Sequence, residues 1–174
     1  MVVKNNYFWK DDQKKIDFIA NGDILKVERL IRIEEVYGYR LATATVRFPD
    51  YHDLEMEVRL LLNVIELEGP SLGREAQKEL FRAIAEDYPE AGNRRQLSQK
   101  LAEDPYFNAL QVKYAYALTC HKAQGGQWKA VFFDQAHFSR DMLDTAYLRW
   151  LYTAFTRASE KLYLLNFSPD FIPQ

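Results

Sequence analysis

The sequence predicts an α/β protein with a small antiparallel β unit in its N-terminal half. Apolar residues alternate with charged ones between residues 25 and 60, which is typical of half-buried strands. Residues 114–118 and 130–134 are short apolar runs, as in strands buried on both faces. Residues 145–159 carry apolar side chains at helical spacing, and the apolar segment 161–166 follows. This order of strands and a helix is an α/β pattern.

Turn residues bound the expected N-terminal strands. Asn21 and Gly22 both tolerate positive φ and predict a turn before a strand over residues 25–33. Residues 39–48 are rich in β-branched and aromatic side chains, and residues 54–60 alternate cleanly, so two further strands are expected. Parallel neighbours need long crossovers, so the short turns favour an antiparallel meander or barrel.

Helices are expected after this unit. Ser71 can cap a helix that ends before Pro89, and a second short helix is expected over residues 94–102. Asp144 can cap the amphipathic helix that precedes the strand at 161–166.

Composition narrows the function classes. The chain has 174 residues, enough for one domain with a small appendage, and its 48% hydrophobic content excludes a disordered tail. A net charge of -2 gives no global attraction to nucleic acid or to an anionic membrane, and no apolar run is long enough to span one. The single cysteine, Cys120, excludes an internal disulfide and indicates a reducing, cytoplasmic setting. His52, His121 and His137 do not have metal-ligand spacing, so no metal site is expected.

The most unusual stretch is the polar segment 119–128, which follows the first apolar run. Ligands of open α/β sheets bind at the carboxyl ends of strands. Gly125 and Gly126 allow the backbone to approach a phosphate, and His121 and Lys122 offer donors or charge to the same anion. A phosphate or a nucleic-acid backbone is the expected partner, and the alternative is a polar surface turn.

Two further groups of side chains have a structural and a functional interpretation. Arg157, at the end of the amphipathic helix, has a guanidinium suited to bidentate phosphate contact, or it neutralises the negative helix end. Tyr7, Phe8 and Trp9 could stack on nucleic-acid bases, although such a cluster is more often core.

Together these segments resemble a known family. Residues 117–128 (ALTCHKAQGGQW) and 150–164 (WLYTAFTRASEKLYL) are similar to motifs V and VI of superfamily 1 helicases, in the order seen in the RecD-like branch, which includes the alpha subunit of exodeoxyribonuclease V. Residues 5–7 (NNY), followed by 21–24 (NGDI), resemble the RecD-like segment that enters an inserted Src-homology-3-like barrel.

The resemblance implies a domain plan. Residues 1–14 and 105–174 would form a RecA-like C-terminal helicase domain. Residues 15–70 would be the inserted small antiparallel β-barrel, and residues 71–104 a helical connection.

The resemblance also implies roles for individual residues. Arg157 would be the motif VI arginine that reaches the γ-phosphate and acts as the catalytic group. The other implied nucleotide contacts are Gln124, Gly125 and Gln127. The implied DNA contacts are Asn6, Thr119, His121 and Lys122. Gln127 stands where relatives usually have glutamate, and Gly126 where serine is common.

The implied activity is ATP-driven translocation on DNA in repair or recombination. The chain has no Walker-type G-x-x-x-x-G-K-[ST] loop, so we expect it not to hydrolyse ATP alone. ATP and Mg²⁺ would be held mainly by an upstream RecA-like domain of the same polypeptide. Single-stranded DNA would be the other partner, with no membrane involved. The alternative is a non-catalytic module that binds DNA or protein through the barrel.

Overall fold

The computed structural model describes residues 1–10, 16–135 and 138–171, and it has a mixed α/β structure, as the sequence predicts. Contacts divide the chain into two compact units, Met1–Ala115 and Tyr116–Gln174, called unit 1 and unit 2 below. The expected boundary between residues 14 and 15, and His137, lie outside the described residues. The division into a motor domain, an inserted barrel and a helical connection stays a prediction.

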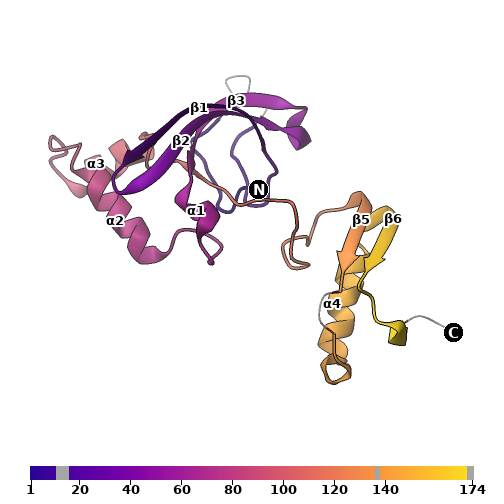
Figure 1. Ribbon diagram of the computed structural model, residues 1–174. Helices are drawn as coiled ribbons and strands as arrows, with labels where there is room; N and C mark the ends of the chain where they lie inside the picture. The colour runs from indigo at the N-terminus through magenta and orange to yellow at the C-terminus, as the bar shows by residue number, and fades with distance from the viewer. Residues whose placement is uncertain (11–15, 136–137, 172–174) are drawn as a thin grey trace. The chain divides into compact units, whose positions relative to one another are not determined.

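Unit 1 is built on a four-stranded sheet (Figure 1). Its strands β1 (Lys26–Val36), β2 (Tyr39–Phe48) and β3 (Leu54–Leu61) pair antiparallel in sequence order, which confirms the predicted meander. The short strand β4 (Leu110–Gln111) pairs parallel to β3 and was not expected from the sequence.

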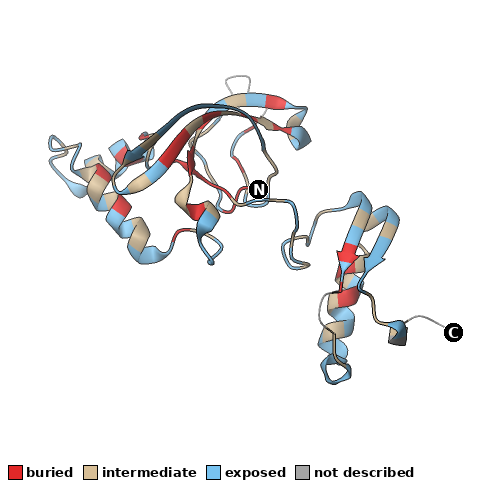
Figure 2. Cartoon of the chain, viewed as in Figure 1, coloured by how far each residue is buried: buried red, intermediate tan, exposed pale blue. Residues whose placement is uncertain are grey.

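The core of unit 1 lies mainly on β2 and β3, as the buried residues in Figure 2 show. Ala42, Ala44, Val46 and Phe48 are fully buried on β2, and Val58 faces them from β3. Pairing in this region is regular, so each strand keeps one face on the core.

Strand β1 differs from the half-buried strand that its sequence predicts. Val27, Leu30, Ile31 and Ile33 are exposed by 41–55%. The strand lies at the edge of the sheet, and its register against β2 shifts twice, between Val27 and Arg29 and between Leu30 and Arg32. Each shift changes which residues face inward, so the expected period-two face is not maintained.

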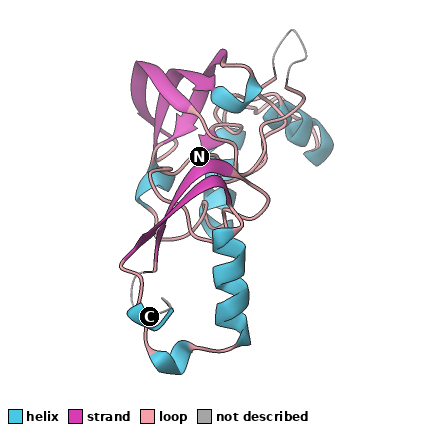
Figure 3. Ribbon diagram, turned by 90° about the vertical axis from the view of Figure 1, so that its right-hand side faces the viewer, coloured by secondary structure: helices cyan, strands magenta, loops and turns pink. Residues whose placement is uncertain are grey.

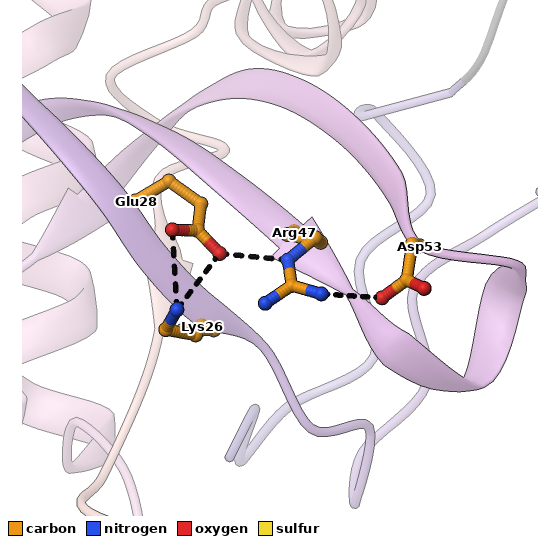
Figure 4. Close-up of polar contacts among 4 residues, drawn as sticks. All are labelled: Lys26, Glu28, Arg47 and Asp53. Carbon is orange, nitrogen blue, oxygen red and sulfur yellow. Dashed lines mark hydrogen bonds and ion pairs between the residues drawn. The ribbon is translucent and has the colours of Figure 1, made fainter.

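Ion pairs connect β1, β2 and the turn before β3 at one end of this sheet (Figure 4). The guanidinium of Arg47 donates to Glu28 of β1 over 2.7 Å and to Asp53, before β3, over 2.6 Å. Lys26 also pairs with Glu28, and these contacts hold the pKa of the Glu28 carboxyl below its usual value. Exposed ion pairs of this kind add little stability.

The helices of unit 1 follow the sheet. They are α1 (Asn63–Glu66), α2 (Arg74–Ala85) and α3 (Arg94–Ala102), and a 3-10 turn, η1 (Pro49–Tyr51), precedes β3. The prediction that Ser71 caps α2 is wrong, because the helix begins later and Gly73 occupies the cap position without a side-chain hydrogen bond. The side chain of Asn93 caps α3 by accepting from the Gln96 amide over 3.0 Å.

The N-terminal residues belong to unit 1. Val2 pairs with Val112 and Asn6 pairs with Ile19 in isolated antiparallel bridges. Val2 is fully buried in the same core as β2, so this segment is part of the fold of unit 1.

Unit 2 is a β-α-β arrangement. Strands β5 (Trp128–Asp134) and β6 (Ala158–Leu165) pair parallel, and α4 (Thr145–Phe155) connects them (Figure 3). Leu151 and Ala154 of α4 pack with Phe133 of β5 in a buried cluster. The 3-10 turns η2 (Arg140–Met142) and η3 (Pro169–Phe171) complete its elements. The predicted cap Asp144 is confirmed, because its carboxylate accepts from the Tyr147 amide over 2.7 Å.

The strand predicted at residues 114–118 is wrong. These residues form loop and bend, with Tyr114 and Tyr116 exposed by 68% and 93%. A strand needs a neighbour to pair its backbone groups, and β5 pairs with β6 alone among the described residues. No described helix is both long and apolar enough to cross a membrane.

Candidate functional site

The polar segment after residue 118 folds into consecutive tight turns before β5. The Ala123 amide donates to the Thr119 carbonyl over 3.1 Å, and the Gly126 amide donates to Ala123 over 3.2 Å. The Lys122 amide reaches the Thr119 hydroxyl at 3.4 Å. The side chains of His121 and Lys122 are left exposed on this turn. The hydroxyl that the sequence suggested for a ligand is therefore part of the turn itself.

The two glycines are required for different reasons. Gly125 has a φ of +86°, which L side chains rarely adopt, and open space lies where its Cβ would be. Gly126 lies against the indole of Trp128, and a Cβ there would come within 2.4 Å of the ring. Open space therefore lies at the Cβ position of Gly125, whereas the Trp128 ring occupies that of Gly126.

Arg157 connects the end of α4 to this turn. Its Nε donates to the Thr153 carbonyl over 2.9 Å, and one terminal nitrogen donates to the Thr156 hydroxyl over 3.0 Å. The other terminal nitrogen donates to the Gly126 carbonyl over 3.0 Å. The arginine thus satisfies a carbonyl at the helix end and also reaches the glycine turn, so both interpretations of this residue have a geometric basis.

Further bonds hold the same two segments together. The Gln127 amide group donates to the Thr156 carbonyl over 3.4 Å, and the backbone amide of Trp128 donates to the Arg157 carbonyl over 2.8 Å. The guanidinium of Arg157 has five N–H groups, and its bonds to Thr153, Thr156 and Gly126 use three of them. Two donors therefore remain for an anion beside the turn.

An open pocket of about 230 Å³ lies between the turn and α4. His121 and Gln124 line it from the turn, and Arg149, Trp150 and Thr153 line it from the helix. Arg149 is not among the residues that the sequence singled out. It is exposed on α4, one helical turn before Thr153, whose carbonyl accepts from Arg157.

Cys120 is half-buried at the start of the turn, and its Sγ donates to the Trp150 carbonyl over 3.5 Å. Burial raises the pKa of the thiol, and the nearby charge of Arg157 partly offsets this. A raised pKa keeps the thiol protonated, so the residue is poorly suited to act as a nucleophile. Among the described residues, no group of three or more potential ligands is arranged to hold a metal ion.

Asn6 lies in unit 1, away in sequence from the other candidates, and its amide is used within the fold. Its nitrogen donates to the Asn108 carbonyl over 2.8 Å, and its oxygen accepts from the amides of Phe8 and Trp9. The structure thus brings Arg157 into contact with Gly126, and Gln127 into contact with Thr156 beside it. It gives Asn6 a role in the N-terminal segment, and its DNA contact stays a prediction.

Comparison with known proteins agrees with the motif region. Residues 114–165 match the family model of the UvrD-like helicase C-terminal domain, a span that includes the glycine turn, α4 and Arg157. This match supports a C-terminal region of a superfamily 1 helicase. No curated protein matches the chain.

Proposed function

We propose that this chain is the C-terminal motor region of a RecD-like superfamily 1 DNA helicase that uses ATP hydrolysis to move along single-stranded DNA in repair or recombination. It works with an upstream RecA-like domain of the same polypeptide, in the cytoplasm. A RecA-like fold and an inserted Src-homology-3-like barrel are parts of this proposal.

The observation that carries the proposal is the bond from the Arg157 guanidinium to the Gly126 carbonyl at 3.0 Å. It joins the end of α4 to the glycine turn, and the span that matches the helicase domain family includes both. A guanidinium held from two sides, with two N–H groups left over, is suited to charge that develops on a transferring phosphoryl group.

In this proposal the residues of the turn divide between two ligands. Exposed His121 and Lys122, with Thr119, contact the phosphates of single-stranded DNA. Gln124, Gly125 and Gln127 face the nucleotide, and the glutamine at 127 contributes an amide where a carboxylate is common. Because Gln127 also bonds to the backbone beside Arg157, it can transmit a change at one ligand to the other.

The residues of the turn and Arg157 fit the phosphates of ATP but not Mg²⁺. The turn and Arg157 offer hydrogen-bond donors for phosphate oxygens, whereas Mg²⁺ prefers carboxylate and water oxygens. The metal ion and the β-phosphate are therefore assigned to the upstream domain. When bound, ATP would supply the phosphoryl group, and Arg157 would stabilise its charge during transfer.

The test uses the protein that joins this chain to its Walker-type domain. Arg157→Ala should lower DNA-stimulated ATP hydrolysis by about 10³–10⁵-fold, as arginine fingers do elsewhere, while ATP binding changes little. Arg157→Lys should fail similarly, because an ammonium lacks the planar fork. Lys161→Ala, an exposed cation on β6, is the matched control and should keep its turnover.

Loss of folding must be separated from loss of chemistry, because Arg157 makes three internal bonds. Thermal unfolding of each variant reports the fold, and free guanidinium ion should partly restore turnover to Arg157→Ala if only the donor is missing. Wild-type turnover by Arg157→Ala would remove the assignment.

The same three bonds favour a second candidate, a non-catalytic module in which Arg157 only stabilises unit 2 and the β unit binds DNA or protein. In that case Arg157→Ala lowers the melting temperature, and no DNA-stimulated ATP hydrolysis is found in any form of the protein.

A further inference from the structure

Unit 1 contains a second cavity, unrelated to the glycine turn. It is open to solvent, has a volume of about 950 Å³, and lies between residues 4–8, helices α2 and α3 and the segment 107–111. A hydrogen bond of 3.4 Å from the Lys4 ammonium to the Gln77 side chain connects the N-terminal segment to α2 beside it. The cavity belongs to unit 1 alone.

Its lining has one sign of charge. Of the eighteen described residues that line it, five are basic and none is acidic, although the chain as a whole carries more acidic than basic side chains. The basic residues are Lys4, Arg74, Lys78, Arg82 and Arg94. Cations gathered around a concave surface raise the local concentration of an anionic ligand.

The arginines are available for a ligand. Lys78 pairs with Glu75 over 2.7 Å, so its charge is partly compensated. Arg74, Arg82 and Arg94 are exposed, and their guanidinium groups make no hydrogen bond or ion pair with any other described residue. Three guanidinium groups around one opening are suited to a chain of phosphates more than to a single carboxylate.

Aromatic rings reach the same cavity. Phe107 is exposed and packs edge-on against Phe81 of α2, with ring centroids 6.0 Å apart. Tyr7 is also exposed and stacks on Phe18 at 5.2 Å. Rings held by a neighbour while one face or edge remains in solvent can stack on nucleic-acid bases.

The amide side chains of the cavity are already used. Asn6 and Asn108 form an internal pair of bonds with backbone, and the buried Gln111 accepts from the Leu72 amide over 2.8 Å. Gln77 donates to the Leu72 carbonyl. The lining therefore offers few free groups that could read base edges, and it favours recognition of phosphates and base faces.

We propose that this cavity binds a short segment of single-stranded nucleic acid, independently of base sequence, with phosphates on the arginines of α2 and α3 and a base against Phe107. An acidic protein segment would pair with the arginines. It would not explain why aromatic rings are exposed beside amide side chains that are already hydrogen-bonded. The site is separate from the glycine turn, and it does not depend on the helicase role.

The test measures binding of a fluorescein-labelled thymidine oligonucleotide of about 12 nucleotides, within the range of single-strand site sizes, to the full chain by anisotropy. In the double variant Arg82→Ala/Arg94→Ala, two phosphate contacts are lost, so the slope of log K against log salt should fall by about 1.4. Phe107→Leu keeps an apolar side chain and should weaken binding about 5- to 150-fold. An adenosine oligonucleotide should bind similarly.

Arg95→Ala is the matched control, since Arg95 is an exposed arginine on α3 that does not line the cavity. Binding and salt slope should stay as in the wild type for this variant. Equal effects of Arg95→Ala and the double variant would overturn the proposal, as would a loss of all binding in Lys122→Ala. A glutamate-rich peptide that displaces the oligonucleotide at lower concentration than unlabelled oligonucleotide would assign the cavity to a protein partner instead.

Discussion

Asp104 is a buried carboxylate that organises the segment carrying Phe107, and its removal should be costly. One oxygen accepts from the amides of Tyr106 and Phe107 over 2.8 and 2.7 Å, and the other accepts from the Tyr88 hydroxyl over 2.7 Å. Hydrogen bonds to a charged group contribute about 1.5–3 kcal/mol each, and burial of the carboxylate offsets several kcal/mol of their sum. We expect Asp104→Ala to lower the free energy of unfolding by about 2–5 kcal/mol.

Asp104→Asn separates the two oxygens. The amide oxygen can still accept from both backbone amides, but the amide nitrogen cannot accept from the Tyr88 hydroxyl, so we expect roughly the loss of one such bond, about 1.5–3 kcal/mol. Calorimetric unfolding gives the stabilities, and hydrogen exchange at the Phe107 amide reports the local opening.

Tyrosine titration provides an independent readout. The hydrogen bond to Asp104, with burial, raises the pKa of Tyr88 from 10.0 to about 12. Because the pKa of Tyr88 is raised in the folded state, the stabilisation of the fold by this hydrogen bond is complete below pH 10. It is lost as the pH rises through 12. The destabilisation by Asp104→Ala should therefore shrink at alkaline pH. The reasoning is refuted if the variant unfolds within about 0.5 kcal/mol of the wild type, or if Tyr88 still titrates near 12 in it.

Two further predictions concern other parts of the chain. Gly126→Ala should lower stability by about 1–3 kcal/mol through the clash with the Trp128 ring, and urea unfolding should show that the effect disappears in a Trp128→Ala background. Burial and a hydrogen bond raise the pKa of Tyr51 from 10.0 to about 12, so the wild type should lose melting temperature between pH 10 and 12. The melting temperature of Tyr51→Phe should fall less over this pH range. Identical pH profiles of melting temperature for the variant and the wild type would contradict the prediction.

Much of the local structure could be predicted from the sequence because its signals are local. The predicted strand 39–48 and helix 94–102 coincide with β2 and α3, since turn residues and a capping asparagine define their ends. Asp144 is predictable as a cap for the same reason. Such signals depend on a few neighbouring residues and are not altered by distant packing.

Features that depend on distant neighbours could not be predicted. Whether β1 buries one face depends on its position at the sheet edge and on two register shifts, neither of which its alternation encodes. Residues 114–118 are apolar enough for a strand, but a strand also requires a partner. Likewise the pairing of β4 with β3 depends on two residues meeting a strand about fifty residues earlier.

The candidate site was partly accessible to sequence reasoning. The glycine pair and Arg157 stand out by residue type, and the structure places Gly126 and Arg157 in contact. The reason for Gly126, a ring two residues later, could not be read from spacing. The cavity of unit 1 was hidden as well, because its arginines are spread over two helices whose charges look like ordinary solvated faces.

The exposed apolar side chains of β1 have a consequence for how the protein behaves at high concentration. An outer strand of eleven residues is a template on which a second molecule can add a strand, but six of its residues are charged and its two irregularities distort the edge. These charges act as gatekeepers against fibrous or amorphous precipitation, because a strand that adds to this edge would have to strip water from them. Replacing Arg29 or Arg32 by a neutral residue should therefore lower the highest protein concentration at which the protein stays monodisperse, while its melting temperature hardly changes.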